Sequence, residues 1–209
     1  EEGRHRDNVR GGGVAGPQSA ALVIRDNLRH RADIENAYLE AIAAAREEII
    51  IANAYFLPGQ RFRRALVRAA RRGVRVTLLL QGRVEYLLLH YASRALYGSL
   101  LDAGVQIHEY VGGFLHAKVA VCDGHWATVG SSNIDPFSLM LAREANVVVD
   151  DRGFAGQLRT SLLAAIQERA RQVQPARWRS RPPWERLPVW MAYALVRTLM
   201  GMFGYGGQH

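Results

Sequence analysis

The chain has 209 residues, of which 49% are hydrophobic and 22% charged, and its formal net charge is +8 at neutral pH. The apolar share excludes an intrinsically disordered chain and is enough for one domain with a buried core. The single cysteine, Cys122, excludes an internal disulfide and a cysteine-based zinc cluster. The positive charge favours an anionic partner, which can be nucleic acid, acidic lipid or a phosphorylated substrate.

Helical and strand patterns alternate along the chain after a polar, glycine-rich opening. Residues 1–20 are predicted to be a flexible linker. Apolar periodicity predicts helices over 31–47, 60–72, 86–103 and 153–172. Apolar, β-branched runs predict strands over 48–57, 74–80, 105–110, 117–122, 126–129 and 145–149. This alternation predicts an α/β fold in which a mixed β-sheet is sandwiched by helices.

The basic residues are strongly biased towards one type. The chain contains 26 arginines and one lysine, which is Lys118, two residues after His116. An arginine replaces lysine easily in a surface ion pair, but its planar guanidinium is a poor substitute for a compact ammonium with three rotatable donors. The surviving lysine is therefore a candidate for chemistry, and chance survival is the alternative.

The pattern of residues 116–133 predicts a cluster of polar side chains. Asp123-Gly124 predicts a hairpin turn between the strands on either side of it. Because side chains alternate between the faces of a strand, His116 and Lys118 share one face. With the turn at 123–124 or one residue later, the pairing places Ser131 and Asn133 on that same face.

Such a cluster suits a phosphate group. Lysine, serine and asparagine side chains donate hydrogen bonds to oxygen, and an imidazole can attack phosphorus or transfer a proton near neutral pH. The alternative is a structural core histidine with a lysine that reaches out to solvent. Four convergent polar groups on apolar strands would carry a desolvation cost without any use, so the pattern favours a functional site.

The spacing of these residues resembles that of a known family. His116-x-Lys118, Asp123 and Gly130-Ser131-x-Asn133 match the signature of the phospholipase D superfamily, the HKD motif. The wider chain, over about 22–172, resembles the second half of bacterial cardiolipin synthases, most closely those of the cardiolipin synthase B kind. The stretches that carry this likeness are NAYFLPG (53–59), RALVRAARRGVRVTLLLQG (64–82), FLHAKVAVCDG (114–124) and GSSNIDPFSL (130–139).

The resemblance implies a phosphatidyl transfer in two steps through a phosphohistidine, with no metal and no other cofactor. The first motif of such enzymes usually supplies the nucleophile, so His116 in a second half is expected to be the general acid and base. Lys118, Ser131 and Asn133 are expected to hold the phosphoryl oxygens.

Two acidic residues complete the candidate catalytic set. Glu144 stands where the family places an acidic residue that orients a catalytic histidine. Relatives tend to read Leu-Asn-x-Glu there, whereas this chain has Ala142, which leaves the local support of Glu144 in question. Asp123 belongs to the motif, although a structural role at the turn is the favoured interpretation.

Only one motif is present, whereas the family's active site uses two. A chain that opens in a linker-like run without methionine is expected to be a fragment whose N-terminal half is missing, and a symmetric dimer of single-motif chains is the alternative. The predicted organisation is a linker (1–20), a phospholipase D-like catalytic half-domain (21–174) and a basic, hydrophobic, membrane-associating tail (175–209).

The predicted tail combines charge with apolar surface. Residues 168–186 carry six arginines and two glutamates, and 187–206 are apolar on nearly every side, with Arg197 in mid-run. This favours a helix that lies in the interface of an anionic membrane over one that spans it. A helix packed on the missing half is the other interpretation.

These features predict a bacterial enzyme at the cell membrane, peripheral or monotopic, on the cytoplasmic face. Its expected donor is phosphatidylglycerol, and its acceptor a second phosphatidylglycerol or another lipid alcohol. The runner-up is a phospholipase D-like phosphodiesterase or nuclease that works as a homodimer. A nuclease should show an open basic groove with aromatic platforms for bases. The non-enzymatic alternative is a membrane-binding module.

Overall fold

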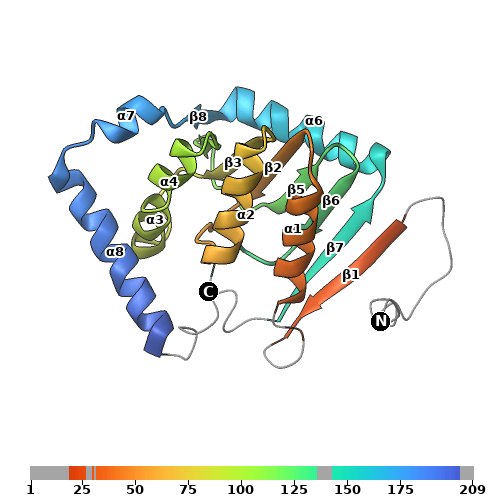
Figure 1. Cartoon of the computed structure of the whole chain (residues 1–209), viewed down its shortest axis with the longest axis horizontal. Helices are drawn as coiled ribbons and strands as arrows, with labels where there is room; N and C mark the ends of the chain where they lie inside the picture. Colours follow the sequence, from red (N-terminus) through yellow and green to blue (C-terminus); the bar gives the residue numbers. More distant parts are fainter. Residues whose placement is uncertain (1–18, 27–29, 31, 136–142, 203–209) are drawn as a thin grey trace.

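The computed structural model describes residues 19–26, 30, 32–135 and 143–202 (Figure 1). The strands are β1 (Ser19–Arg25), β2 (Glu48–Asn53), β3 (Arg75–Gln81), β4 (Gln106–Tyr110), β5 (Lys118–Cys122), β6 (Trp126–Gly130), β7 (Glu144–Asp150) and β8 (Ala170–Gln172). The helices are α1 (Asp33–Ala44), α2 (Gln60–Arg71), α3 (Leu87–Arg94), α4 (Tyr97–Asp102), α6 (Arg152–Arg169), α7 (Pro175–Arg179) and α8 (Pro183–Met202).

The strands form one mixed sheet in the order β1-β7-β6-β5-β2-β3-β4-β8. Strands β2, β3 and β4 run parallel, and every other neighbouring pair is antiparallel. The parallel strands at the centre are almost wholly buried, as expected for strands covered on both faces. The predicted α/β fold with a mixed, helix-covered sheet is confirmed.

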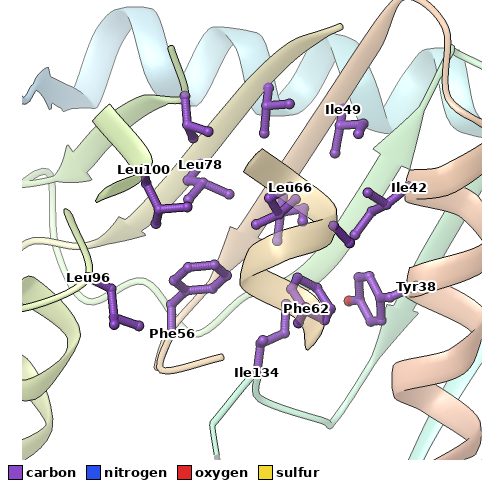
Figure 2. Close-up of a cluster of buried hydrophobic side chains, with 14 of the residues drawn as sticks. Tyr38, Ile42, Ile49, Phe56, Phe62, Leu66, Leu78, Leu96, Leu100 and Ile134 are labelled. Carbon is purple, nitrogen blue, oxygen red and sulfur yellow. The ribbon is translucent and has the colours of Figure 1, made fainter. Parts of the chain in front are cut away.

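Helices cover the two faces of the sheet (Figure 1). On one face, Leu66 of α2 and Tyr38 of α1 pack with Ile49 of β2 and Leu100 of α4 in the larger core cluster (Figure 2). On the other face, α6 packs over a smaller cluster centred on β2, β3, β5 and β6. The alternation of apolar side chains along these strands supplies both clusters at once.

Several predicted boundaries were wrong. The helix predicted over 86–103 is two helices, α3 and α4, and the helix predicted over 153–172 ends at Arg169, after which the chain adds β8 to the edge of the sheet. The strand predicted over 48–57 ends at Asn53. Strand β1 was not predicted, although residues 20–24 form an apolar run, and most of its residues are exposed. Its first two residues, Ser19 and Ala20, belong to the predicted linker, whose other residues lie outside the described part of the chain.

The predicted register of the hairpin was also wrong. Asp123 and Gly124 have φ angles of +49° and +64° and form the turn, but the ladder pairs Cys122 with Trp126. His125 is an extra residue outside this ladder, so the pairing lies one residue away from both predicted registers. Lys118 therefore shares its face with Gly130, and Ser131 lies just past the end of β6.

The C-terminal helix packs onto the rest of the chain. Val189, Ala192 and Val196 of α8 are buried, and the last two belong to the larger core cluster. Figure 1 shows α8 alongside α3. The other face of α8 is exposed. In the described part of the chain, no helix combines the length and apolar character needed to cross a bilayer.

Candidate active site

The candidate residues other than Asp123 lie at one end of the strands, where β2 and β6 end and β5 and β7 begin. We call this row of strand ends the sheet edge of the site. Strand β5 runs antiparallel to β2, so Lys118 lies opposite Asn53, the last residue of β2. Gly130 ends β6 opposite Asn146. A Cβ atom on Gly130 would lie 2.1 Å from Asn146 Oδ1, so only glycine permits this close approach.

Lys118 is a buried cation in acidic surroundings. The residue is 6% exposed, and its Nζ donates a hydrogen bond of 3.1 Å to the carbonyl oxygen of His116. Burial lowers the pKa of the Lys118 ammonium, while the charges of Glu144, Asp135 and Glu85 act in the opposite direction. An anionic oxygen beside this ammonium would relieve its desolvation.

His116 lies immediately before β5 and is exposed to solvent. Its carbonyl oxygen holds the Lys118 ammonium, so backbone and side chain of the motif's first two residues are tied together. The exposure leaves the imidazole accessible to a substrate, which is the requirement for either role considered for it.

Ser131 and Glu144 are in direct contact. The Ser131 hydroxyl donates a short hydrogen bond to Glu144 Oε2 and accepts one of 3.1 Å from the backbone N–H of Ala145. Because Glu144 also acts electrostatically on Lys118, its carboxylate couples the hydroxyl and the ammonium. Glu144 therefore interacts with Ser131 by a hydrogen bond and with Lys118 through its charge. Ala142, which replaces the family's asparagine, lies outside the described residues.

Asn133 is held at the same edge by its neighbours. Ser132 N–H donates to Asn146 Oδ1 at 3.4 Å, and Ile134 N–H donates to Asn53 Oδ1 at 3.2 Å. The Ile134 side chain points into the core beside Phe62 (Figure 2). These anchors fix the backbone on both sides of the half-buried Asn133.

Asn53 is a site residue that the sequence did not single out. It is fully buried on the same face as Lys118, directly across the ladder. Its Oδ1 is used by Ile134, and its Nδ2 is a buried donor without an acceptor among the described residues. The available signal was a carboxamide at the end of an otherwise apolar strand.

Asp123 lies at the opposite end of β5. Its carboxylate accepts hydrogen bonds from the backbone N–H groups of Arg46 (2.8 Å), Glu47 (2.9 Å) and Glu48 (2.9 Å). Burial alone would raise the pKa of the Asp123 carboxyl, but these three donors outweigh burial and lower it. Five steps of about 3.4 Å along the strand separate Asp123 from Lys118 by about 17 Å.

The arrangement at the His116 end fits a phosphodiester. It offers one cation, a hydroxyl and carboxamides at the strand ends beside which the exposed His116 lies. These are the group types that binding of phosphoryl oxygens and proton transfer require. Among the residues that the structure describes, no group of three or more histidine, cysteine, aspartate or glutamate side chains is placed to hold a metal ion.

The family model described as "Cardiolipin synthase, PLD-like domain" matches residues 38–165, more than half of the chain. The chain belongs to this family. It is 45% identical over 194 residues to cardiolipin synthase B of Escherichia coli K12, a match that covers 93% of this chain and 47% of that protein. The chain thus spans about half the length of the curated relatives that it matches, and the family resemblance is confirmed.

Two solved structures share the fold. Nuc from Salmonella typhimurium, a phospholipase D family member, has a TM-score of 0.64 at 20% identity, over 75% of this chain and 99% of Nuc. The phosphatidylserine synthase of Haemophilus influenzae has a TM-score of 0.66 at 10% identity, over 90% of this chain and 46% of the synthase. The same unit therefore makes up nearly all of one neighbour and about half of the other.

Proposed function

We propose that this chain supplies one of the two HKD motifs of a cardiolipin synthase-type phosphatidyltransferase. The observation that carries the proposal is the buried Lys118 ammonium at the sheet edge, with Ser131 and Asn133 nearby and the accessible imidazole of His116 beside it. The 45% identity to cardiolipin synthase B supports phospholipid as the substrate class. Asp123 is proposed to be structural, because its carboxylate is occupied at the far end of β5.

In the first step, the imidazole of the other motif, the one that this sequence does not contain, attacks the phosphorus of phosphatidylglycerol. The bond between phosphorus and the glycerol headgroup oxygen breaks, and protonated His116 donates its proton to that leaving oxygen. Lys118, Ser131 and Asn133 hold the non-bridging oxygens, on which negative charge accumulates. The products are free glycerol and a phosphatidyl group bonded to the nucleophilic histidine of the other motif.

In the second step, neutral His116 takes the proton from an acceptor alcohol. The alcohol oxygen attacks phosphorus, and the phosphorus–nitrogen bond breaks, which regenerates the nucleophile. With a second phosphatidylglycerol as acceptor, the product is cardiolipin. Water in the same position would give hydrolysis, so the balance between the two reactions depends on how well the acceptor site excludes water.

An exposed apolar row on the sheet face opposite to Lys118 suits contact with the other motif-bearing half. Leu22, Val147, Val129 and Val119 lie next to one another across β1, β7, β6 and β5. The first three are substantially exposed, near the edge that carries Ser131 and Glu144. A partner half seated there would cover this row and bring its own motif towards His116.

The exposed apolar face of α8 supports a lipid substrate over nucleic acid. It presents large side chains to solvent, which suits a membrane interface and not a groove for bases. We accordingly place the protein at the bacterial membrane as a peripheral or monotopic enzyme on the cytoplasmic face, with the basic residues of the C-terminal region towards anionic lipid.

The test uses the full-length natural protein with labelled phosphatidylglycerol in micelles, with and without His116→Ala, followed by lipid separation. Labelled cardiolipin from the unmutated protein, and at least about 10²-fold less from the variant, is expected for loss of a general acid and base. Absence of cardiolipin from the unmutated protein would remove the proposal.

The same protein preparation also tests the alternative function, a homodimeric phosphodiesterase. That function predicts two copies of this unit per particle by light scattering, and cleavage of single- or double-stranded DNA that His116→Ala abolishes. The fold match to nearly the whole of the Nuc chain is the observation that motivates this control. Cardiolipin formation without DNA cleavage supports the transferase.

A further inference from the structure

A cavity with a charged and aromatic lining lies away from the candidate active site, between α3, α4, α7 and α8. Its volume is about 390 Å³, within the range of small-ligand sites. Four arginines and two carboxylates line it, together with Trp178 and Trp190. The arginines are Arg94, Arg179, Arg181 and Arg186. This arginine–tryptophan pocket shares no lining residue with the His116 site.

Two of the arginines are already neutralised. Arg94 forms an ion pair of 2.6 Å with Glu109, and Arg179 forms one of 2.7 Å with Asp102. Arg186 donates to the carbonyl oxygen of Arg179, which leaves its charge uncompensated by that contact. Arg181 and Arg186 then remain against the single carboxylate of Glu185, so the pocket keeps an excess of positive charge.

Arg181 is the arginine of the pocket that stacks on a tryptophan, and Glu185 and Glu109 act on it only through their charges. Its guanidinium stacks at 4.0 Å on the ring of Trp178, and among the described residues it forms no ion pair. Burial and then the nearby charge of Arg94 lower the pKa of Arg181. A stacked, partly buried cation next to another cation is stabilised by an anionic ligand, and guanidinium groups match phosphate oxygens in a bidentate manner.

The pocket opens beside an apolar surface. Trp190, which lines the pocket, also belongs to the exposed face of α8, where Leu187 and Met191 are 60% and 63% exposed. This face is opposite the buried residues of the helix and continues to Trp184 and Leu195. A ligand with a phosphate at one end and acyl chains at the other fits both parts at once.

We infer that the arginine–tryptophan pocket binds the phosphate headgroup of an anionic glycerophospholipid while the exposed face of α8 lies against the acyl chains. This inference rests on the proposed function for its membrane setting, but not on the transfer chemistry. The bound lipid is not a substrate here. It docks the enzyme on an anionic bilayer and fixes the orientation of α8, and so of the sheet, relative to the membrane.

The experiment measures flotation of the full-length protein with phosphatidylcholine vesicles, with and without phosphatidic acid, which carries no headgroup alcohol to be displaced. Arg181→Gln removes the charge and keeps a side chain that can cover Trp178. Arg152→Gln is the control. Arg152 is exposed at the start of α6, and its substitution changes the net charge by the same amount. Thermal unfolding midpoints establish that both variants are folded.

Arg181→Gln should weaken binding to phosphatidic acid vesicles by about tenfold or more, as expected for one lost charge-assisted contact. Arg152→Gln should change it by less than about fivefold, the effect of one surface charge. Equal losses in the two variants would overturn the inference. So would equal flotation with and without phosphatidic acid in the vesicles, because the pocket would then not recognise an anionic headgroup.

A second readout needs no variant. Monomeric dihexanoyl phosphatidic acid should change the tryptophan fluorescence saturably, since Trp178 and Trp190 line the pocket. No change in emission would contradict the inference. Cardiolipin synthesis in detergent micelles is measured in parallel. A protein that binds vesicles through Arg181 but makes no cardiolipin would refute the proposed function and leave the lipid-binding inference intact.

Discussion

Both ends of β5 carry charged or ionisable side chains, but only at one end are these side chains held by several partners. At the Asp123 end, the carboxylate accepts three backbone hydrogen bonds, and the neighbouring Glu48 pairs with Arg75 and Arg159. At the Lys118 end, the one hydrogen-bond partner of the buried ammonium among the described residues is a backbone carbonyl, and the imidazole before it is exposed. The first arrangement stabilises the native state. The second holds groups ready for a ligand, at a cost in stability.

The largest expected effect comes from Lys118→Met, which removes the cation and keeps a side chain of similar length. Phosphatidyl transfer should fall by about 10²–10³-fold, as for removal of a donor to a developing oxyanion. Stability against urea should stay the same or rise, because burial disfavours the Lys118 charge. A variant that is both active and strongly destabilised would make Lys118 a structural residue and break the comparison.

Glu144→Gln should have a smaller effect, roughly tenfold on kcat, from the loss of one charge-assisted contact. The carboxylate raises the pKa of Lys118, so its removal should move the alkaline limb of the kcat profile to lower pH. Asp150→Asn is the matched control, because Asp150 ends the same strand that Glu144 begins. An unshifted alkaline limb in Glu144→Gln would contradict the coupling to Lys118.

Asp123→Asn should act on stability alone. The amide keeps one oxygen acceptor, so the free energy of unfolding should fall by about 1.5–3 kcal/mol, the range for hydrogen bonds to a charged group. Asparagine tolerates the left-handed backbone of Asp123, where φ is +49°, so the turn itself should persist. Urea unfolding and kcat are the two measurements. A loss of kcat in fully folded protein would return Asp123 to the catalytic set.

The smallest expected effect is a loss of folding stability at acidic pH. The pKa values of Asp123 and Glu48 are lowered in the folded chain, for Glu48 because Arg159 and Arg75 outweigh burial. Between the folded and the ordinary values, about 4, the unfolded chain binds more protons, so stability increases with pH there. The stabilisation from these two carboxylates is fully present above their ordinary pKa values. It is lost as the pH falls through their lower pKa values in the folded chain. Urea midpoints from pH 7 to pH 3 should fall less steeply in Glu48→Gln than in wild type.

Local pattern was enough for the layers of the fold and for the motif. Apolar runs and helical periodicity located β2, β3 and β4 and the helices that cover them. The spacing from His116 to Asn133 predicted a phosphate site, and phosphate binding there stays a prediction. The hairpin register could not be predicted, because the extra residue at His125 depends on how the turn at Asp123 and Gly124 closes.

Contacts between distant segments account for most of the remainder. Asn53 holds the backbone N–H of Ile134 from 81 residues away, and nothing local to Asn53 indicates this contact. The arginine–tryptophan pocket likewise combines α3 with residues that follow α6 by many positions. The predicted basic tail contained three of its arginines, Arg179, Arg181 and Arg186, but neither Arg94 nor the cavity that the four form.

The most direct test of the site is a crystal structure of the full-length protein with bound vanadate, a mimic of the transferred phosphoryl group. We expect vanadate at the start of β5, with an oxygen about 3 Å from Lys118 Nζ and others within hydrogen-bond reach of Ser131 or Asn133. The His116 imidazole should face the same vanadium atom. Vanadate bound elsewhere, with Lys118 still held by the His116 carbonyl and its ammonium out of reach, would contradict the account.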